Sequence, residues 1–201
     1  MIKVLDAVFV ATATEVKQCP REPLPEVAFV GRSNVGKSSM INTLVNRKKL
    51  VRVSHTPGRT RTMNFFDVTL EHGSRKRRVR LCDLPGYGFA KVSKTERAQW
   101  QEMISAYLNN RRDLKVVVSI IDAEVGPTPD DVQMLDFLQA APPRILIAAT
   151  KLDRLSKSHR VPRIRELTKQ LDVPEGTVVG FSALENIGHT EVWGRLLEGT
   201  S

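Results

Sequence analysis

The chain has 201 residues, of which 41% are hydrophobic and 26% charged, an ordinary mixture for one globular domain with short extensions. Aromatic residues make up only 5%, which argues against a stacking surface for single-stranded nucleic acid. The net charge of +9 favours a polyanionic partner such as RNA, DNA or an anionic membrane surface, although solubility alone would also explain it.

The cysteine content and the start of the chain bear on where the protein works. Cys19 and Cys82 lack a paired spacing, which favours free thiols in a reducing compartment over a disulfide or a metal site. Residues 1–14 lack the basic start and apolar block of a secretory signal, and no apolar run approaches the roughly 20 residues of a membrane helix. We therefore expect a cytoplasmic protein without a membrane span, and we expect it to be a monomer.

The first 25 residues differ in character from the rest of the chain. Residues 15–25 contain three prolines and several charges, a composition typical of a surface loop. We expect residues 1–25 to be an N-terminal strand and loop packed on a main domain that spans residues 26–201. Short apolar runs then predict strands that are buried on both faces. These runs are Val27–Val30, Val116–Ile121, Ile145–Ala149 and Val178–Phe181.

Two further patterns complete the predicted fold. Alternating apolar residues at 66–70 and 79–81 flank His72-Gly73-Ser74, which predicts an antiparallel hairpin at the sheet edge. Apolar residues at helical spacing lie between the buried strands, which predicts an α/β fold of three layers with a mostly parallel sheet. They are Met40, Ile41, Leu44 and Val45, then Val132, Leu135, Phe137 and Leu138, then Trp193, Leu196 and Leu197.

A glycine-rich loop follows the first buried strand and leads into the first helical pattern. In this context G-x-x-x-x-G-K-[ST] is typical of a phosphate-binding loop, because its backbone N–H groups and the helix N-terminus attract phosphate oxygens. Lys37 would bind the β- and γ-phosphates, and the Ser38 hydroxyl would ligate Mg²⁺. We expect the nucleotide phosphates to contact Gly31, Arg32, Ser33, Asn34, Val35, Gly36, Lys37, Ser38 and Ser39.

An acidic residue leaves the second hairpin strand in the sequence Asp83-Leu84-Pro85-Gly86. Such a carboxylate beside a phosphate loop can hold Mg²⁺, usually through a water molecule. Gly86 would let its backbone N–H approach the γ-phosphate, where a side chain would obstruct it. Alone the pattern could be a plain turn, but its place after the phosphate loop favours a nucleotide site.

Two later motifs predict that the base is guanine. Asp153, in Thr150-Lys151-Leu152-Asp153, can accept hydrogen bonds from guanine N1–H and N2–H₂, donors that adenine does not present together. The stem of Lys151 can cover the face of the base. Ser182-Ala183-Leu184 follows the last buried strand and would offer the Ala183 backbone N–H to guanine O6.

These elements, in this order, resemble the five G motifs of the TRAFAC class of P-loop GTPases. SHTPGRTRTMNFF at 54–66, DLPGYGFA at 83–90 and TKLD at 150–153 resemble the EngB family, also called YihA or YsxC, over nearly the whole chain. The resemblance implies a GTP-hydrolysing switch in the assembly of the large ribosomal subunit. It also implies a link to cell division.

The resemblance assigns further roles within the nucleotide site. Pro57 and Gly58 precede Thr60, which would complete Mg²⁺ coordination in the GTP state. Asn34 matches an asparagine that ligates K⁺ in related potassium-activated GTPases. Arg61 stands where the family usually has glutamine, and Thr150 stands where most GTPases have asparagine. The catalytic set implied is Lys37, Thr60 and Gly86.

Tyr87 occupies the position where many GTPases place a glutamine that orients the attacking water. We therefore expect slow intrinsic hydrolysis, accelerated by K⁺ or by a ribosomal partner. Val51–Met63 and Gly86–Lys94 would change conformation with the nucleotide, because loss of the γ-phosphate removes contacts to Thr60 and Gly86.

Three basic clusters could provide a surface for rRNA, and we favour such a role for at least one of them. The alternative for the first is a solvated edge that prevents strand pairing. They are Arg75, Lys76, Arg77, Arg78 and Arg80; then Arg47, Lys48, Lys49 and Arg52; then Arg154, Lys157, His159, Arg160, Arg163 and Arg165.

Two other functions fit parts of the pattern. One is a binding module whose GTP state controls docking, with negligible turnover. The other is a P-loop ATPase or nucleotide kinase. Asp153 and Ser182-Ala183 disfavour ATP, and the chain lacks an arginine-rich lid or a second substrate motif typical of a kinase.

Overall fold

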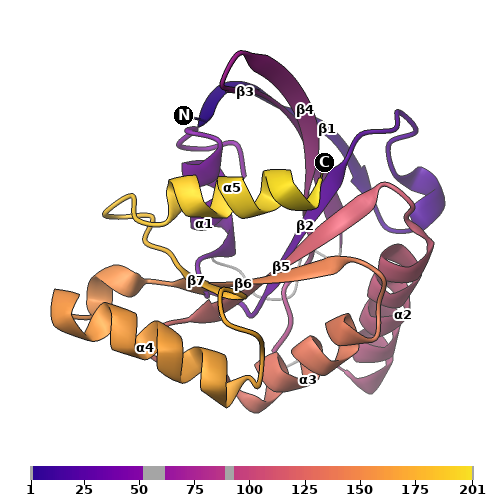
Figure 1. Cartoon of the computed structure of the whole chain (residues 1–201). Coiled ribbons are helices and arrows are strands. Elements are labelled where there is room, and N and C mark those ends of the chain that lie inside the picture. Colours follow the sequence, from indigo (N-terminus) through magenta and orange to yellow (C-terminus); the bar gives the residue numbers. More distant parts are fainter. Residues whose placement is uncertain (1, 52–61, 89–92, 201) are drawn as a thin grey trace.

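The computed structural model describes residues 2–51, 62–88 and 93–200. A central sheet lies between two layers of helices, which confirms the predicted three-layer α/β/α fold (Figure 1). The sheet has seven strands in the order β1-β3-β4-β2-β5-β6-β7, and every neighbouring pair is parallel except those made by β3. The strands are β1 (Ile2–Ala13), β2 (Glu26–Gly31), β3 (Met63–His72), β4 (Arg75–Asp83), β5 (Leu114–Asp122), β6 (Arg144–Thr150) and β7 (Val178–Gly180).

The four short apolar runs form β2, β5, β6 and β7, the parallel half of the sheet. All six residues of β2 are buried, as are eight of the nine in β5. Strands covered on both faces need apolar side chains at every position, so they carry no alternating pattern. The carboxyl ends of these strands lie at one edge of the sheet, where loops that carry functional residues converge in folds of this kind.

The predicted hairpin is present, but it is not at the edge of the sheet. His72 of β3 pairs with Arg75 of β4 across the turn at Gly73, whose φ is +63°. β1 pairs antiparallel with β3 along its length and takes the edge instead. The ladder shows register shifts at Val4/Asp6 and at Phe9/Ala11, so β1 lacks a clean alternation of apolar and polar residues. The division into residues 1–25 and 26–201 stays a prediction.

Helices cover both faces of the sheet (Figure 1). α1 and α5 pack on one face, where Trp193 Nε1 of α5 donates a hydrogen bond to Leu44 O of α1 at 2.9 Å. α2, α3 and α4 pack on the other face. The sequence patterns indicated α1, α3 and α5 but not α2 or α4, which bury few side chains. The helices are α1 (Lys37–Leu44), α2 (Lys94–Asn110), α3 (Pro129–Gln139), α4 (Lys157–Gln170) and α5 (His189–Gly199).

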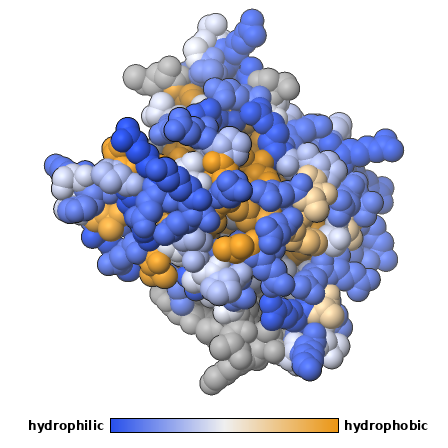
Figure 2. Space-filling view, turned by 60° about the horizontal axis from the view of Figure 1, so that its bottom comes forward, coloured by the Kyte–Doolittle hydropathy of each residue, from blue (hydrophilic) through white to orange (hydrophobic). Residues whose placement is uncertain are grey.

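The face of the molecule drawn in Figure 2 is mostly polar. Figure 2, in which the bottom of Figure 1 comes forward, shows hydrophilic side chains around a central group of hydrophobic ones. Among the described residues, no helix combines the length and the apolar character needed to cross a membrane.

Candidate functional site

The phosphate-loop motif joins the carboxyl end of β2 to the first turn of α1. Gly36 is the N-cap of α1 and has φ +101°, a conformation that L side chains rarely adopt. Asn34 also has a left-handed backbone, with φ +63°, and its side chain is exposed. Ser38 and Ser39 lie in the first turn of α1. A curled loop of this kind, followed by the unpaired N–H groups of a helix end, is suited to binding an anion.

The segment after β4 runs alongside the phosphate loop. Tyr87 N donates to Gly31 O, and Ser33 N donates to Tyr87 O, both at 3.3 Å. The Ser33 N–H therefore points at Tyr87 and not into the loop. A Cβ on Gly86 would lie 3.1 Å from Gly31 O, too close for a side chain without displacing the loop. Two separate motifs are thus held together by backbone contacts, and a side chain on residue 86 would crowd Gly31 O at their closest approach.

Lys37 and Asp83 form an ion pair between these two segments. The Lys37 side chain is 13% exposed and that of Asp83 is 11% exposed. A pair this sheltered from water is less screened than a surface pair. Each member therefore fixes the position of the other at the mouth of the phosphate loop.

Thr150 connects the third motif to the phosphate loop. Its Oγ1 lies 2.6 Å from Val35 O and 3.0 Å from Ile121 O, and the side chain is buried. A hydroxyl has one proton to donate, so it bonds one of these carbonyls at a time. Thr150 therefore ties the end of β6 to the phosphate loop, although it has no amide to offer.

The neighbouring Lys151 is held by Asp122, an acidic residue that was not among the predicted site residues. Lys151 has φ +58°, and its Nζ lies 2.7 Å from Asp122 Oδ2 at the end of β5. Burial opposes ionisation of Asp122, but the hydrogen bonds from Lys151 and from two backbone N–H groups outweigh it and lower its pKa. Asp122 could have been identified from the sequence, because it is an acidic residue directly after the apolar run Val116–Ile121. This contact orients the stem of Lys151.

Asp153 and Ser182 meet at the ends of β6 and β7. Ser182 Oγ donates to Asp153 Oδ1 at 2.5 Å and accepts a hydrogen bond from Glu185 N at 3.0 Å. Ser182 is fully buried, whereas Ala183 is exposed and Leu184 is 84% exposed. The serine thus orients the carboxylate, and the two residues that follow it lie at the surface.

A second contact that was not predicted joins Arg32, Tyr87 and Asp131, three residues that are far apart in the sequence. Tyr87 donates from its hydroxyl to Asp131 Oδ1 of α3 at 2.8 Å. Arg32 Nε lies 3.2 Å from Asp131 Oδ2, an ion pair without the alignment of a hydrogen bond. Burial and the charge and hydrogen bond of Asp131 raise the pKa of Tyr87. The Tyr87 side chain is therefore bound to α3 and turned away from chemistry at the phosphate loop.

Some predicted site residues lie outside the part of the chain that the structure describes. They are Pro57, Gly58 and Thr60, together with Arg61, so their proposed roles in binding Mg²⁺ and the γ-phosphate stay predictions. The described residues do bring together the phosphate loop, Asp83, Gly86, the 150–153 motif and Ser182.

Comparison with known proteins agrees with this arrangement. The sequence profile described as "50S ribosome-binding GTPase" matches residues 26–151. The probable GTP-binding protein EngB of Myxococcus xanthus is 61% identical over 198 residues, which cover 98% of this chain and 96% of the relative. The protein of the same description from an Anaeromyxobacter species is 49% identical and covers 97% and 91%, respectively.

Solved structures give the same result for the fold. A crystal structure of a probable GTP-binding protein engB has a TM-score of 0.65 and 25% identity, and the match covers 87% of this chain and 98% of that one. Era, in a complex with MgGDPNP and nucleotides 1506–1542 of 16S ribosomal RNA, has a TM-score of 0.69 and 24% identity, over 88% of this chain and 57% of Era. The chain therefore belongs to the EngB family of GTP-binding proteins, and it is a GTPase.

Proposed function

We propose that this GTPase is a cytoplasmic, monomeric switch in the assembly of the large ribosomal subunit. The main support for a nucleotide site is that three segments meet at the carboxyl ends of β2, β4, β6 and β7. They are the phosphate loop, the 83–87 segment, and the 150–153 motif with Ser182 beside it. The description of the matching family as ribosome-binding supports the ribosomal role. The link to cell division stays a prediction.

The residues present suit Mg²⁺ held together with nucleotide phosphates. Mg²⁺ in such sites takes one or two protein oxygen ligands, and phosphates and waters supply the rest. The site has the Asp83 carboxylate and the Ser38 hydroxyl, and the described residues contain no cluster of three or more His, Cys, Asp or Glu side chains. Ser38 and Thr60 would ligate the ion and Asp83 would hold one of its waters. The bound ion would neutralise charge on the phosphates.

Lys37 would bind the phosphates of the nucleotide, and Asp153 would select guanine as its base. Lys37, which pairs with Asp83, lies at the loop where the β- and γ-phosphates would bind. Asp153, oriented by Ser182, would accept from guanine N1–H and N2–H₂, and the exposed Ala183 would offer its N–H to O6. The Lys151 stem, held by Asp122, would cover the base.

We expect the intrinsic hydrolysis to be slow. The Tyr87 hydroxyl is bonded to Asp131, so the residue after Gly86 supplies no group to orient water. The same observation favours a second candidate function, a nucleotide-gated ribosome-binding module with negligible turnover. K⁺ bound near the exposed Asn34 would provide positive charge for the reaction. A turnover assay in KCl and in NaCl, with and without large ribosomal subunits, separates these cases.

The three basic clusters differ in how many of their charges are already paired. In the cluster on α4 and before it, Arg154, Arg160 and Arg163 each pair with a glutamate. In the hairpin cluster, Arg80 is buried against Asp67, and Arg78 pairs with Glu22 and Asp67. These arginines hold the fold together.

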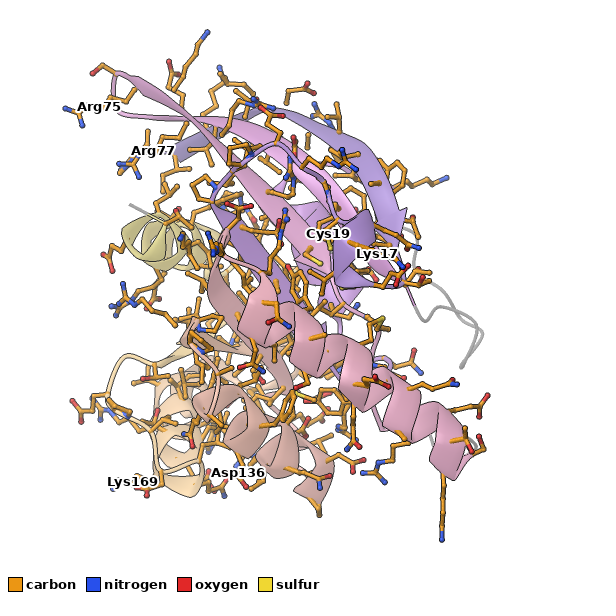
Figure 3. The ribbon with its side chains drawn as sticks, turned by 90° about the vertical axis from the view of Figure 1, so that its right-hand side faces the viewer. Lys17, Cys19, Arg75, Arg77, Asp136 and Lys169 are labelled. Atoms are coloured by element: carbon orange, nitrogen blue, oxygen red, sulfur yellow. The ribbon has the colours of Figure 1, made fainter. Side chains whose placement is uncertain are left out.

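Arg75 and Lys76 at the hairpin turn are different. Both are exposed, and neither has an ion-pair partner among the described residues. Figure 3 shows Arg75 and Arg77 at the hairpin end of the molecule, far from Lys169 of α4. Eight residue steps of β4 separate Arg75 from Asp83, about 26 Å at ~3.3 Å per residue. We propose that this hairpin end contacts rRNA, at a distance from the nucleotide.

Binding to purified large subunits at several salt concentrations tests this surface. Arg75→Gln with Lys76→Gln should weaken binding about tenfold and reduce the slope of log K against log salt by about 1.5, since two phosphate contacts are lost. The loss should be equal with GDP and with a GTP analogue. The charge-matched control is Lys157→Gln with Arg165→Gln on α4. If both double variants lost the same affinity for the large subunit, net charge alone would explain the effect. If the hairpin variant lost no affinity, this surface would be excluded.

A further inference from the structure

The side-chain hydroxyl of Ser33 is a buried polar group without a hydrogen-bond partner among the described residues. Its backbone N–H is satisfied by Tyr87 O at 3.3 Å, so the hydroxyl alone is left. Arg32 Nε is the other buried side-chain atom in this condition within the described part of the chain, and it has Asp131 Oδ2 at 3.2 Å. Native proteins rarely bury a hydroxyl without a partner, because its lost hydration is not replaced. Ser33 therefore calls for a functional explanation.

The hydroxyl lies between the phosphate loop and Gly86. A Cβ built on Gly86 would be 3.6 Å from Ser33 Oγ and 3.5 Å from Ser33 N. The same Cβ would be 3.1 Å from Gly31 O. Ser33 Oγ thus faces the glycine whose backbone N–H would approach the terminal phosphate.

Two polar side chains of the same two segments are already bonded to protein groups. The Tyr87 hydroxyl donates to Asp131, and Lys37 pairs with Asp83. Ser33 Oγ–H is therefore a donor that makes no hydrogen bond within the described residues, so a ligand acceptor would not compete with one. A hydroxyl that donates to a charged phosphate oxygen makes a shorter and stronger hydrogen bond than it does to a neutral acceptor.

We propose that Ser33 Oγ donates a hydrogen bond to the terminal phosphate of GTP and thereby discriminates GTP from GDP. The proposal rests on the nucleotide site proposed above and adds to it a side-chain contact that GDP lacks. The contact satisfies the buried hydroxyl only in the GTP state, so it favours the conformation in which Gly86 lies against the phosphate loop.

The test compares Ser33→Ala with wild-type protein in titrations with a non-hydrolysable GTP analogue and with GDP, in the presence of Mg²⁺. Ser33→Ala should lower the affinity for the analogue about tenfold, equivalent to about 1.4 kcal/mol, and leave the affinity for GDP within about twofold. Ser74→Ala, which removes an exposed hydroxyl at the hairpin turn, is the matched control and should change neither affinity.

Thermal unfolding of nucleotide-free protein separates this role from a structural one. Removal of an unsatisfied buried hydroxyl should leave the midpoint of Ser33→Ala unchanged or raise it. A lowered midpoint, an equal loss for both nucleotides, or no loss for the analogue would overturn the proposal. If wild-type protein bound adenine and guanine nucleotides equally, the nucleotide site itself would be wrong and this inference would fail with it. Normal guanine binding with an unaffected Ser33→Ala variant would overturn this inference alone.

Discussion

The two ends of β4 use charge in opposite ways. At its carboxyl end, Asp83 pairs with Lys37 in a sheltered contact, and nearby Lys151 pairs with Asp122. At its amino end, Arg75 and Lys76 are exposed and have no ion-pair partner within the described residues. Charges at the first end hold one another in position, whereas charges at the second remain available to an external partner.

This difference explains what each end can recognise. Internal pairs hold side chains in one geometry, which a small ligand with fixed phosphate and base positions requires. Unpaired exposed arginine and lysine side chains keep their freedom and suit a polymer of phosphates, where charge matters more than position. We therefore expect function at the carboxyl end of β4 to be sensitive to the loss of a single side-chain group. Function at the amino end should depend mainly on the number of charges.

The largest effect is expected for Lys37→Ala. The change removes the cation that would bind the β- and γ-phosphates and leaves Asp83 without its partner. GTP affinity should fall about 100-fold, or about 2.7 kcal/mol, in an equilibrium titration. Lys157→Ala on the exposed start of α4 is the control. If Lys37→Ala bound GTP normally, the charges at the carboxyl end would not serve the nucleotide.

Tyr87→Phe should destabilise the protein without slowing the reaction. The variant leaves the buried Asp131 carboxylate without the Tyr87 hydroxyl, which should lower the free energy of unfolding by about 2 kcal/mol in denaturant titrations. Single-turnover hydrolysis should stay within about threefold of the wild-type rate. Tyr107→Phe, at the buried bond to Glu26, is a matched control for stability. A large loss of rate in Tyr87→Phe alone would place its hydroxyl in the chemistry.

Thr150→Val is the next smaller change. It keeps the shape of the side chain but removes the hydroxyl that reaches Val35 O and Ile121 O. Because Thr150 links the 150–153 motif to the phosphate loop, affinities for GDP and GTP should fall together, about tenfold or 1.4 kcal/mol each. A selective loss of one nucleotide, measured by the same titrations, would contradict a purely connecting role.

The smallest effect is expected at the other end of β4. Arg75→Gln with Lys76→Gln should change nucleotide affinity less than about twofold and the free energy of unfolding by less than about 0.5 kcal/mol, as for exposed surface positions. Titration and denaturation of this variant measure both quantities. A clear loss of either would show that the hairpin charges stabilise the fold or the nucleotide site, and the contrast between the two ends would disappear.

Much of the fold was predictable from local sequence. β2, β5 and β6 are built around short apolar runs, the glycine-rich loop follows β2, and Asp83 is the last residue of β4. α2 and α4 were harder to predict, because α4 buries only Leu167 and most of its other residues are charged or polar. β1 was expected as a strand but not at the edge beside the hairpin, because pairing between distant segments leaves little local signal.

The site shows the same division between local motifs and distant contacts. The residues that follow buried strands could be identified, because loops at the carboxyl ends of parallel strands meet at one edge. The contact of Arg32, Tyr87 and Asp131 could not, because it joins three positions with no shared motif and depends on how α3 packs. The roles of Asp122 and of the Ser33 hydroxyl likewise emerge only from the packed structure.

Nucleotide affinity tests the proposed site most directly, with GDP and GTP measured against ADP and ATP in the presence of Mg²⁺. We predict a guanine preference of about 100-fold, or about 2.7 kcal/mol, that is lost in Asp153→Asn. Ser182 orients the Asp153 carboxylate, so Ser182→Ala should reduce the preference partially. Equal affinity of the wild-type protein for adenine and guanine nucleotides, or an unchanged preference in Asp153→Asn, would contradict the proposed nucleotide site.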